Sequence, residues 1–119
     1  MIEDDRLKTI ISAFVEKHDI LPMKYVYEMF DNGDYYTIDR KYFISIDEYS
    51  EKTTEVTIGI IRVLYENIDE DGDLIFSLEK ESIVSFDMFY YSTEKSLMDD
   101  MVNVCEKYGI IQIYNEWSD

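Results

Sequence analysis

The dipeptide Asp71-Gly72 separates two segments in which β-branched and aromatic residues are dense. Both central residues of a type I′ hairpin turn need a positive φ, and Asp-Gly meets that need at little cost. A two-residue loop at this point places Tyr65 opposite Leu78, so that apolar side chains of the two strands meet on one face. The sequence therefore predicts an antiparallel β-hairpin around this dipeptide.

Several other segments have the composition or the alternation of strands. Residues 54–66 are rich in Val, Ile and Thr, which favours a strand, although the spacing of Ile58, Ile61 and Leu64 leaves a helix as the alternative. Apolar residues alternate with others over residues 36–47, which indicates two strands or one long bent strand. Two more strands are predicted over residues 82–91 and 110–114.

Three segments have the period of amphipathic helices. Residues 3–18 repeat apolar side chains at three-four spacing, with acids at the start and Lys17 at the end, as the helix dipole favours. A short second helix is predicted between Pro22 and the turn at residues 31–34. The third starts at a cap on Ser92 or Thr93 and runs to about residue 107, before a glycine.

These elements together predict a single α+β domain over residues 1–119. We expect two N-terminal helices, a mainly antiparallel sheet of about 4–5 strands, one C-terminal helix and a final short strand. A chain of 119 residues is long enough for one core and too short for two.

The charge of the chain restricts its partners. There are 27 Asp and Glu residues against 11 Lys and Arg, which gives a net charge of −16, while 46% of residues are hydrophobic and can form a core. Nucleic-acid phosphates and anionic membranes should repel such a chain, so we expect no direct nucleic-acid binding and no membrane binding. Neither a secretory signal nor a bilayer-spanning apolar run is recognisable, and a cytoplasmic location is expected. The expected partner is a basic protein.

No residue pattern indicates catalysis or a cofactor. His18 is the only histidine, and Cys105, the only cysteine, falls on the apolar stripe of the last predicted helix. Residues 67–73 resemble the first half of an EF-hand calcium loop, but Leu78 occupies the position where that loop needs a bidentate Glu. We therefore predict a hairpin turn with solvated carboxylates, no specific metal site and no enzyme activity, and keep a calcium-binding module as a minor alternative.

Tyrosines stand beside acids at several places in the chain. Tyrosine offers a large contact area at a low rotamer cost. A neighbouring carboxylate can bind an Arg or Lys of a partner while the ring packs against the same side chain. By alternation we expect Tyr36, Tyr42 and Tyr65 in the core, and Phe43 and Tyr49 on the exposed face. The candidate partner-binding residues are Phe43, Asp47, Glu48, Tyr49, Glu51, Asp69, Glu70, Asp71, Asp73, Asp87 and Tyr90.

These features lead to two functional hypotheses. The first is a small acidic inhibitor that blocks a basic site, most concretely an immunity protein that neutralises a nuclease-type bacterial toxin domain. A nuclease holds phosphate in a cationic cleft, and complementary charge speeds association with such a cleft. The alternative is a phage-encoded nucleic-acid mimic, of the anti-CRISPR or anti-restriction type, that blocks a DNA-binding protein.

Overall fold

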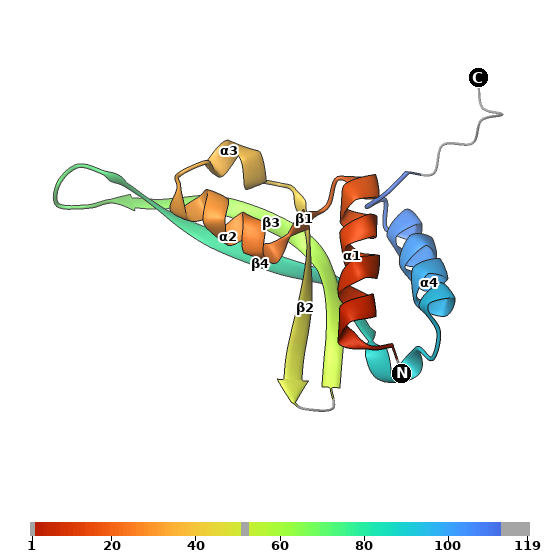
Figure 1. Cartoon of the computed structure of the whole chain (residues 1–119). Helices are drawn as coiled ribbons and strands as arrows, with labels where there is room; N and C mark the ends of the chain where they lie inside the picture. Colours follow the sequence, from red (N-terminus) through yellow and green to blue (C-terminus); the bar gives the residue numbers. More distant parts are fainter. Residues whose placement is uncertain (1, 51–52, 113–119) are drawn as a thin grey trace, which may run out of the picture.

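The chain forms a four-stranded mixed sheet with helices on both faces, which confirms the α+β class (Figure 1). The computed structural model describes residues 2–50 and 53–112. In the sheet, β1 lies parallel to β2, and β2, β3 and β4 are antiparallel in that order. The elements are α1 (Asp4–His18), β1 (Leu21–Pro22), α2 (Met23–Asp31), α3 (Tyr35–Ile38), β2 (Tyr42–Ser50), β3 (Thr53–Ile68), β4 (Leu74–Asp87), the 3-10 helix η1 (Met88–Tyr90) and α4 (Glu94–Lys107).

The β3–β4 hairpin extends well beyond the rest of the sheet (Figure 1). β2 pairs with β3 only as far as Tyr42 opposite Ile60, whereas the pairing of β3 with β4 continues to Ile68 opposite Leu74. Residues 62–80 therefore form a two-stranded projection, which we call the arm. The remainder, which we call the body, carries α1 and α4, and the whole molecule measures 53 × 48 × 19 Å.

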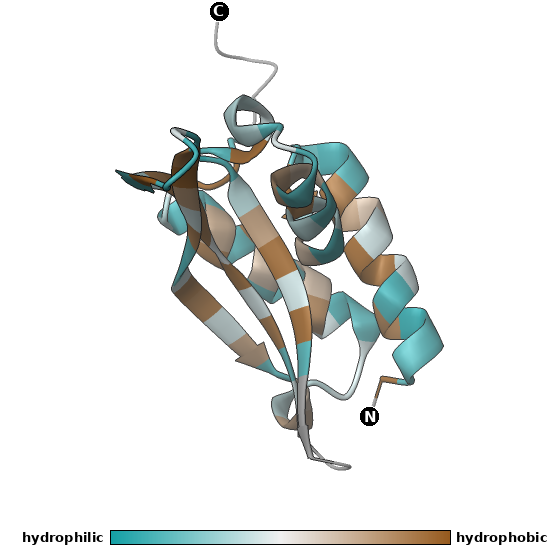
Figure 2. Cartoon of the chain, turned by 90° about the vertical axis from the view of Figure 1, so that its left-hand side faces the viewer, coloured by the Kyte–Doolittle hydropathy of each residue, from teal (hydrophilic) through white to brown (hydrophobic). Residues whose placement is uncertain are grey.

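Two hydrophobic clusters lie on opposite faces of the sheet. Adjacent side chains on a strand point to opposite faces, and accordingly Ile44 packs with α1 and α4 while Phe43 packs with α2 and α3. The first cluster also includes Val56, Ile58 and Phe86 of the sheet. Figure 2 shows apolar positions, in brown, at intervals along the strands of the sheet.

The helix boundaries follow the signals in the sequence. α1 ends at Asp19, which has a left-handed backbone conformation with φ 54°. The side chain of Thr93 caps α4, because its Oγ1 accepts the N–H of Ser96 at 3.1 Å. Gly109 follows α4 with φ +73° and supplies the predicted helix stop. The strand prediction for residues 54–66 is also confirmed, since all of them lie in β3.

The hairpin turn is present, but its predicted loop and register are wrong. Asp69 N–H donates to Asp73 O and Gly72 N–H donates to Asp69 O, so the loop has three residues and ends on Gly72 at φ +84°. The longer loop displaces the register by one residue and the irregularity between Tyr65 and Asn67 displaces it by one more, so Tyr65 pairs with Phe76 instead of Leu78. A register displaced by two residues keeps each side chain on its face, which is why the apolar pairing survives the error.

Three predictions of aromatic exposure are wrong. Phe43 is buried, whereas Tyr36 is fully exposed and Tyr65 is 55% exposed. Residues 35–38 form the short helix α3 instead of a strand, which turns the Tyr36 ring to solvent. Phe43 lies under α2 and opposite Gly59, whose missing side chain leaves room for the ring. Helices cover both faces of β2 here, so alternation could not distinguish an outer face.

The C-terminal part differs from the expected short strand. Ile110 and Ile111 are buried in the first cluster, and Ile110 N–H donates to Cys105 O at 2.8 Å. Residues 110–112 are not a strand, and residues 113 and 114 lie outside the described residues. The separate strand predicted over residues 82–91 is absent, because residues 82–87 continue β4 and residues 88–90 form η1. Within the described ranges no helix has the length and apolar character required to cross a bilayer.

Candidate protein-binding surface

Three carboxylates lie side by side across three strands at the end of the sheet that faces away from the arm. Asp47 of β2 is directly opposite Glu55 of β3, and Glu55 is directly opposite Asp87 of β4. Residues that are directly opposite share a face, with Cβ atoms roughly 4.5–5.5 Å apart. We call these three residues the carboxylate row. It lies on the same face as Phe43, because residues 43, 45 and 47 alternate with those that face α1.

A hydroxyl-lined depression adjoins the carboxylate row. Ser45, Thr57 and Ser85 form the next cross-strand row, and the hydroxyls of Thr57 and Ser85 are 3.1 Å apart. The Ser45 hydroxyl donates to Asp47 Oδ2 at 3.2 Å and so helps to orient that carboxylate. The depression has a volume of about 470 Å³ and is lined at its far side by Lys80. This part of the sheet face is thus polar and hollowed.

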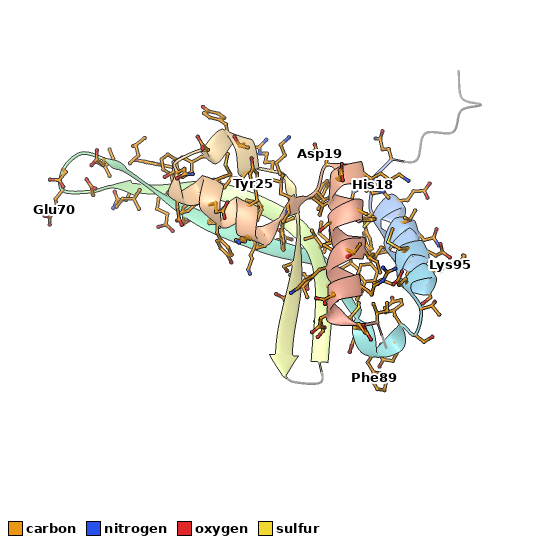
Figure 3. The ribbon with its side chains drawn as sticks, viewed as in Figure 1. His18, Asp19, Tyr25, Glu70, Phe89 and Lys95 are labelled. Carbon is orange, nitrogen blue, oxygen red and sulfur yellow. The ribbon has the colours of Figure 1, made fainter. Side chains whose placement is uncertain are left out.

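Two exposed aromatic side chains follow the row in the chain. Phe89 and Tyr90 in η1 are 76% and 78% exposed, and their rings are perpendicular with centroids 5.4 Å apart. Asp87 Oδ1 accepts the N–H of Phe89 at 2.9 Å, which fixes both the carboxylate and the start of η1. Figure 3 shows Phe89 at this end of the molecule. We call the carboxylate row together with Phe89 and Tyr90 the acidic end.

The structure brings only some of the predicted binding residues together. Asp47, Asp87 and Tyr90 meet at the acidic end, whereas Phe43 is buried under α2 and cannot contact a partner. Glu51 and the side chains of Glu48 and Tyr49 lie outside the described residues.

Sequence reasoning missed Glu55, the central member of the row, and Phe89, the partner ring of Tyr90. Glu55 gains its importance only from the strand register, which places a carboxylate on either side of it. The run of aromatics after Asp87 was the available signal for Phe89.

The remaining predicted residues form a second acidic group at the tip of the arm (Figure 3). The carboxylate oxygens of Asp69, Asp71 and Asp73 lie within 4.8 Å of one another, and all three side chains are exposed, as is that of Glu70. Asp69 Oδ1 accepts the N–H groups of Asp71 and Asp73, each at 2.9 Å, so this carboxylate shapes the loop. Strands flank the loop where an EF-hand needs helices.

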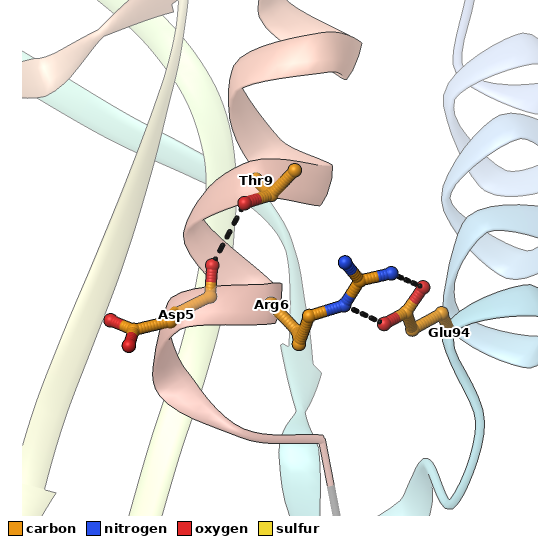
Figure 4. A network of polar contacts seen from close by, with 4 residues as sticks. All are labelled: Asp5, Arg6, Thr9 and Glu94. Carbon is orange, nitrogen blue, oxygen red and sulfur yellow. Dashed lines mark hydrogen bonds and ion pairs between the residues drawn. The ribbon is translucent and has the colours of Figure 1, made fainter.

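Ion pairs within the body neutralise other acids. Arg6 of α1 binds Glu94 of α4 through two hydrogen bonds of 2.6 and 3.0 Å, as Figure 4 shows. The hydrogen bonds and charge of Arg6 lower the pKa of Glu94 below its usual range. Among the described residues, no Lys or Arg lies within 4.0 Å of a carboxylate oxygen of the row. No ion pair among the described residues therefore competes with an external cation for the row.

His18 and Cys105 have the environments of packed side chains. The His18 ring lies 4.7 Å from the Phe14 ring, and partial burial together with the charge of Lys17 lowers its pKa. Cys105 is fully buried in the first cluster, and burial raises the pKa of its thiol to about 11. The thiol is accordingly protonated at neutral pH and is not an activated nucleophile.

Comparisons with protein-family models, with curated proteins and with solved structures give no match to this chain.

Proposed function

We propose that this chain is a small acidic inhibitor that binds and blocks a basic site on another protein through its acidic end. The carboxylate row is the observation that carries the proposal. Like charges that are directly opposite in a sheet destabilise it, and Glu55 has such a neighbour on each side. A cationic surface placed over the row would remove this repulsion. The electrostatic free energy that destabilises the folded chain would then favour binding.

The rest of the acidic end and the net charge support the same function. A net charge of −16 attracts a cationic protein over a distance, and steering of this kind can raise association rates toward 10⁸–10⁹ M⁻¹s⁻¹ at low salt. Phe89 and Tyr90 add exposed rings beside the carboxylates, and aromatic anchors of this type carry much of the binding energy of protein interfaces. Charge then determines the speed of encounter, and the rings determine its duration.

The most concrete form of this function is an immunity protein that neutralises a nuclease-type bacterial toxin domain. The three carboxylates lie on neighbouring strands about 4.8 Å apart, and their combined charge is complementary to the cationic cleft in which a nuclease holds phosphate. The alternative, a phage-encoded nucleic-acid mimic, needs negative charge along a track that follows a DNA channel. The acidic residues at the tip of the arm could extend such a track. A partner that contacts both the tip and the row would therefore favour this alternative.

The test uses the protein domain encoded by the gene that adjoins this one. We expect the purified domain to bind the chain and to lose nuclease activity on binding. Inhibition of several unrelated DNA-binding proteins would favour the nucleic-acid mimic instead. A neighbouring product that neither binds nor is inhibited contradicts the immunity function. Calorimetric titration with calcium tests the minor alternative, which requires saturable heat that is lost in Asp69→Asn.

Two variants with equal charge changes locate the binding surface. The row variant combines Asp47→Asn, Glu55→Gln and Asp87→Asn, and the matched tip variant combines Asp69→Asn, Asp71→Asn and Asp73→Asn. At low salt the row variant should associate at least about tenfold more slowly with the partner, within the range of steering effects. The tip variant should show only the smaller effect of a reduced net charge. Equal losses in both variants would contradict a localised binding surface.

A further inference from the structure

A pocket at the base of the arm has the composition of a receptor for one cationic side chain. It has a volume of about 230 Å³ and is lined by Tyr35, Tyr36, Asp39, Val63 and Phe76. Pockets for drug-sized ligands span about 300–1,000 Å³, so this one has room for a single side chain. Neither the row nor the tip of the arm contributes a residue to it.

The aromatic walls of the pocket are held by a chain of ring contacts. The Tyr35 ring of α3 lies 5.3 Å from Phe30 of α2 and 4.3 Å from Phe76 of the arm. Phe76 in turn lies 6.1 Å from Tyr65, centroid to centroid. These contacts join both helices to the arm and keep the ring faces in place. Tyr36 stands at the rim and is fully exposed, so its ring is free to contact a partner.

Asp39 supplies the charge of the pocket. Its Oδ1 accepts the N–H of Val63 at 2.9 Å, which fixes the carboxylate against β3. Within the part of the chain that the structure describes, no Lys or Arg nitrogen lies within 4.0 Å of this carboxylate. Asp39 lines the pocket, and its other carboxylate oxygen can accept a hydrogen bond from a charged donor of a partner. Half-buried Val63 can contact the aliphatic stem of that donor.

We propose that this pocket binds an Arg or Lys side chain of the basic partner. The negative faces of aromatic rings attract a cation, and a carboxylate at the same site adds a charge-assisted hydrogen bond. Neutral side chains of this size would also fit an aromatic pocket, but the net charge of −16 favours a cationic one. The inference rests on the proposed function, because it names a second contact with the same kind of partner.

A peptide titration tests the pocket without the partner. The probe is an acetylated and amidated Gly-Arg-Gly peptide, and the control is the same peptide with citrulline, which has the shape of arginine without its charge. In NMR spectra of the labelled chain, we expect saturable shifts at Val63, Tyr35 and Phe76 with the arginine peptide. The citrulline peptide should bind at least about tenfold more weakly. Equal binding of both peptides, or arginine-induced shifts confined to the row or the tip, would overturn the inference.

Variants of the pocket provide a second measurement. Tyr36→Ala should weaken binding of the arginine peptide roughly two- to fivefold, as expected for one cation–aromatic contact at an exposed site. Asp39→Asn keeps an acceptor for Val63 and removes the charge, and should weaken binding by at least as much. Tyr108→Ala, which removes an exposed ring from the end of α4, should bind the peptide as the wild type does. Unchanged binding in Tyr36→Ala and Asp39→Asn would exclude the pocket.

The two proposals fail in different ways. If the row variant loses affinity for the basic partner while Tyr36→Ala and Asp39→Asn do not, the pocket assignment is wrong and the inhibitor function stands. If the arginine peptide binds in the pocket but the neighbouring gene product does not bind the chain, the proposed partner is wrong and the pocket remains a cation site.

Discussion

The two ends of the β3–β4 hairpin lie in very different surroundings. In the body, Val56, Ile58 and Phe86 are almost completely buried beneath α1 and α4. On the arm, Tyr65 and Leu74 are more than half exposed, and the covering helices reach only as far as the contact of Tyr35 with Phe76. A two-stranded hairpin alone is marginally stable in water. The body therefore supplies most of the stability of the fold, and the arm is a surface that extends from it.

The acidic groups at the two ends differ in the same way. The carboxylate row is fixed by three paired strands, whereas the carboxylates at the tip of the arm stand on a three-residue loop. Rigid elements hold functional side chains more accurately than loops do. We therefore propose that the row contributes binding specificity and that the tip contributes long-range attraction.

Truncation of an aromatic ring should separate the body from the arm most clearly. Phe43 and Tyr65 lie on the same face of the sheet, but only Phe43 is buried. Phe43→Ala should lower the free energy of unfolding by about 3–5 kcal/mol, because it leaves a cavity under α2. Tyr65→Ala should cost about 1 kcal/mol, the contribution of its edge contact with Phe76. Denaturant unfolding measures both, and similar costs for the two variants would contradict the comparison.

Two glycines should respond to alanine for different reasons. A Cβ at Gly59 would collide with the carbonyl oxygen of Glu81 and would lie 2.7 Å from Cε1 of Phe43. Gly59→Ala should therefore cost about 3 kcal/mol, the upper part of the usual range for overpacking. Nothing lies within 4 Å of a Cβ at Gly72, and only its φ of +84° opposes alanine, at about 1 kcal/mol. Equal unfolding midpoints for the two variants would contradict this difference.

The ion pair between α1 and α4 should make the stability of the body depend on pH. Arg6 lowers the pKa of Glu94 in the folded chain, so the pair stabilises the fold above the ordinary value of 4.5 and loses this effect as the pH falls through the folded value. Glu94→Gln should thus be less stable than the wild type at neutral pH and equal to it in strong acid. Glu81→Gln, which breaks a single 3.4 Å contact with Arg62, should show a smaller difference. If the difference in unfolding free energy between Glu94→Gln and the wild type stays the same in strong acid, this role is contradicted.

Local signals in the sequence predicted most of the fold. The caps, the dipole-matched charges and the glycine stops placed α1, α2 and α4, and the density of β-branched residues identified β3. The faces of β2 could not be predicted, because the cover of Phe43 depends on where α2 packs and on the room left at Gly59. The turn failed because a loop of two or three residues can contain the same Asp-Gly pair.

The candidate site was predictable only in part. Asp47, Asp87 and Tyr90 were recognised from acids beside aromatics, a pattern that is local in the sequence. Glu55 was not, because its position between two carboxylates follows from the pairing of three strands. The aromatic pocket likewise combines residues of α3, the arm and the segment that joins α3 to β2. Long-range pairing therefore had to be known before either site could be found.

The central claim is that the carboxylate row is maintained against its own repulsion for the sake of a cationic partner. The unfolding free energy of Glu55→Gln, measured at low and at high salt, tests this most directly. We predict that the variant is more stable than the wild type by about 0.2–1 kcal/mol at low salt and that salt reduces the gain. Glu79→Gln is the matched control, since Glu79 is opposite Arg62 and its neutralisation should not stabilise the chain. The claim would be contradicted if Glu55→Gln were less stable than the wild type, or if its gain in unfolding free energy were the same at low and at high salt.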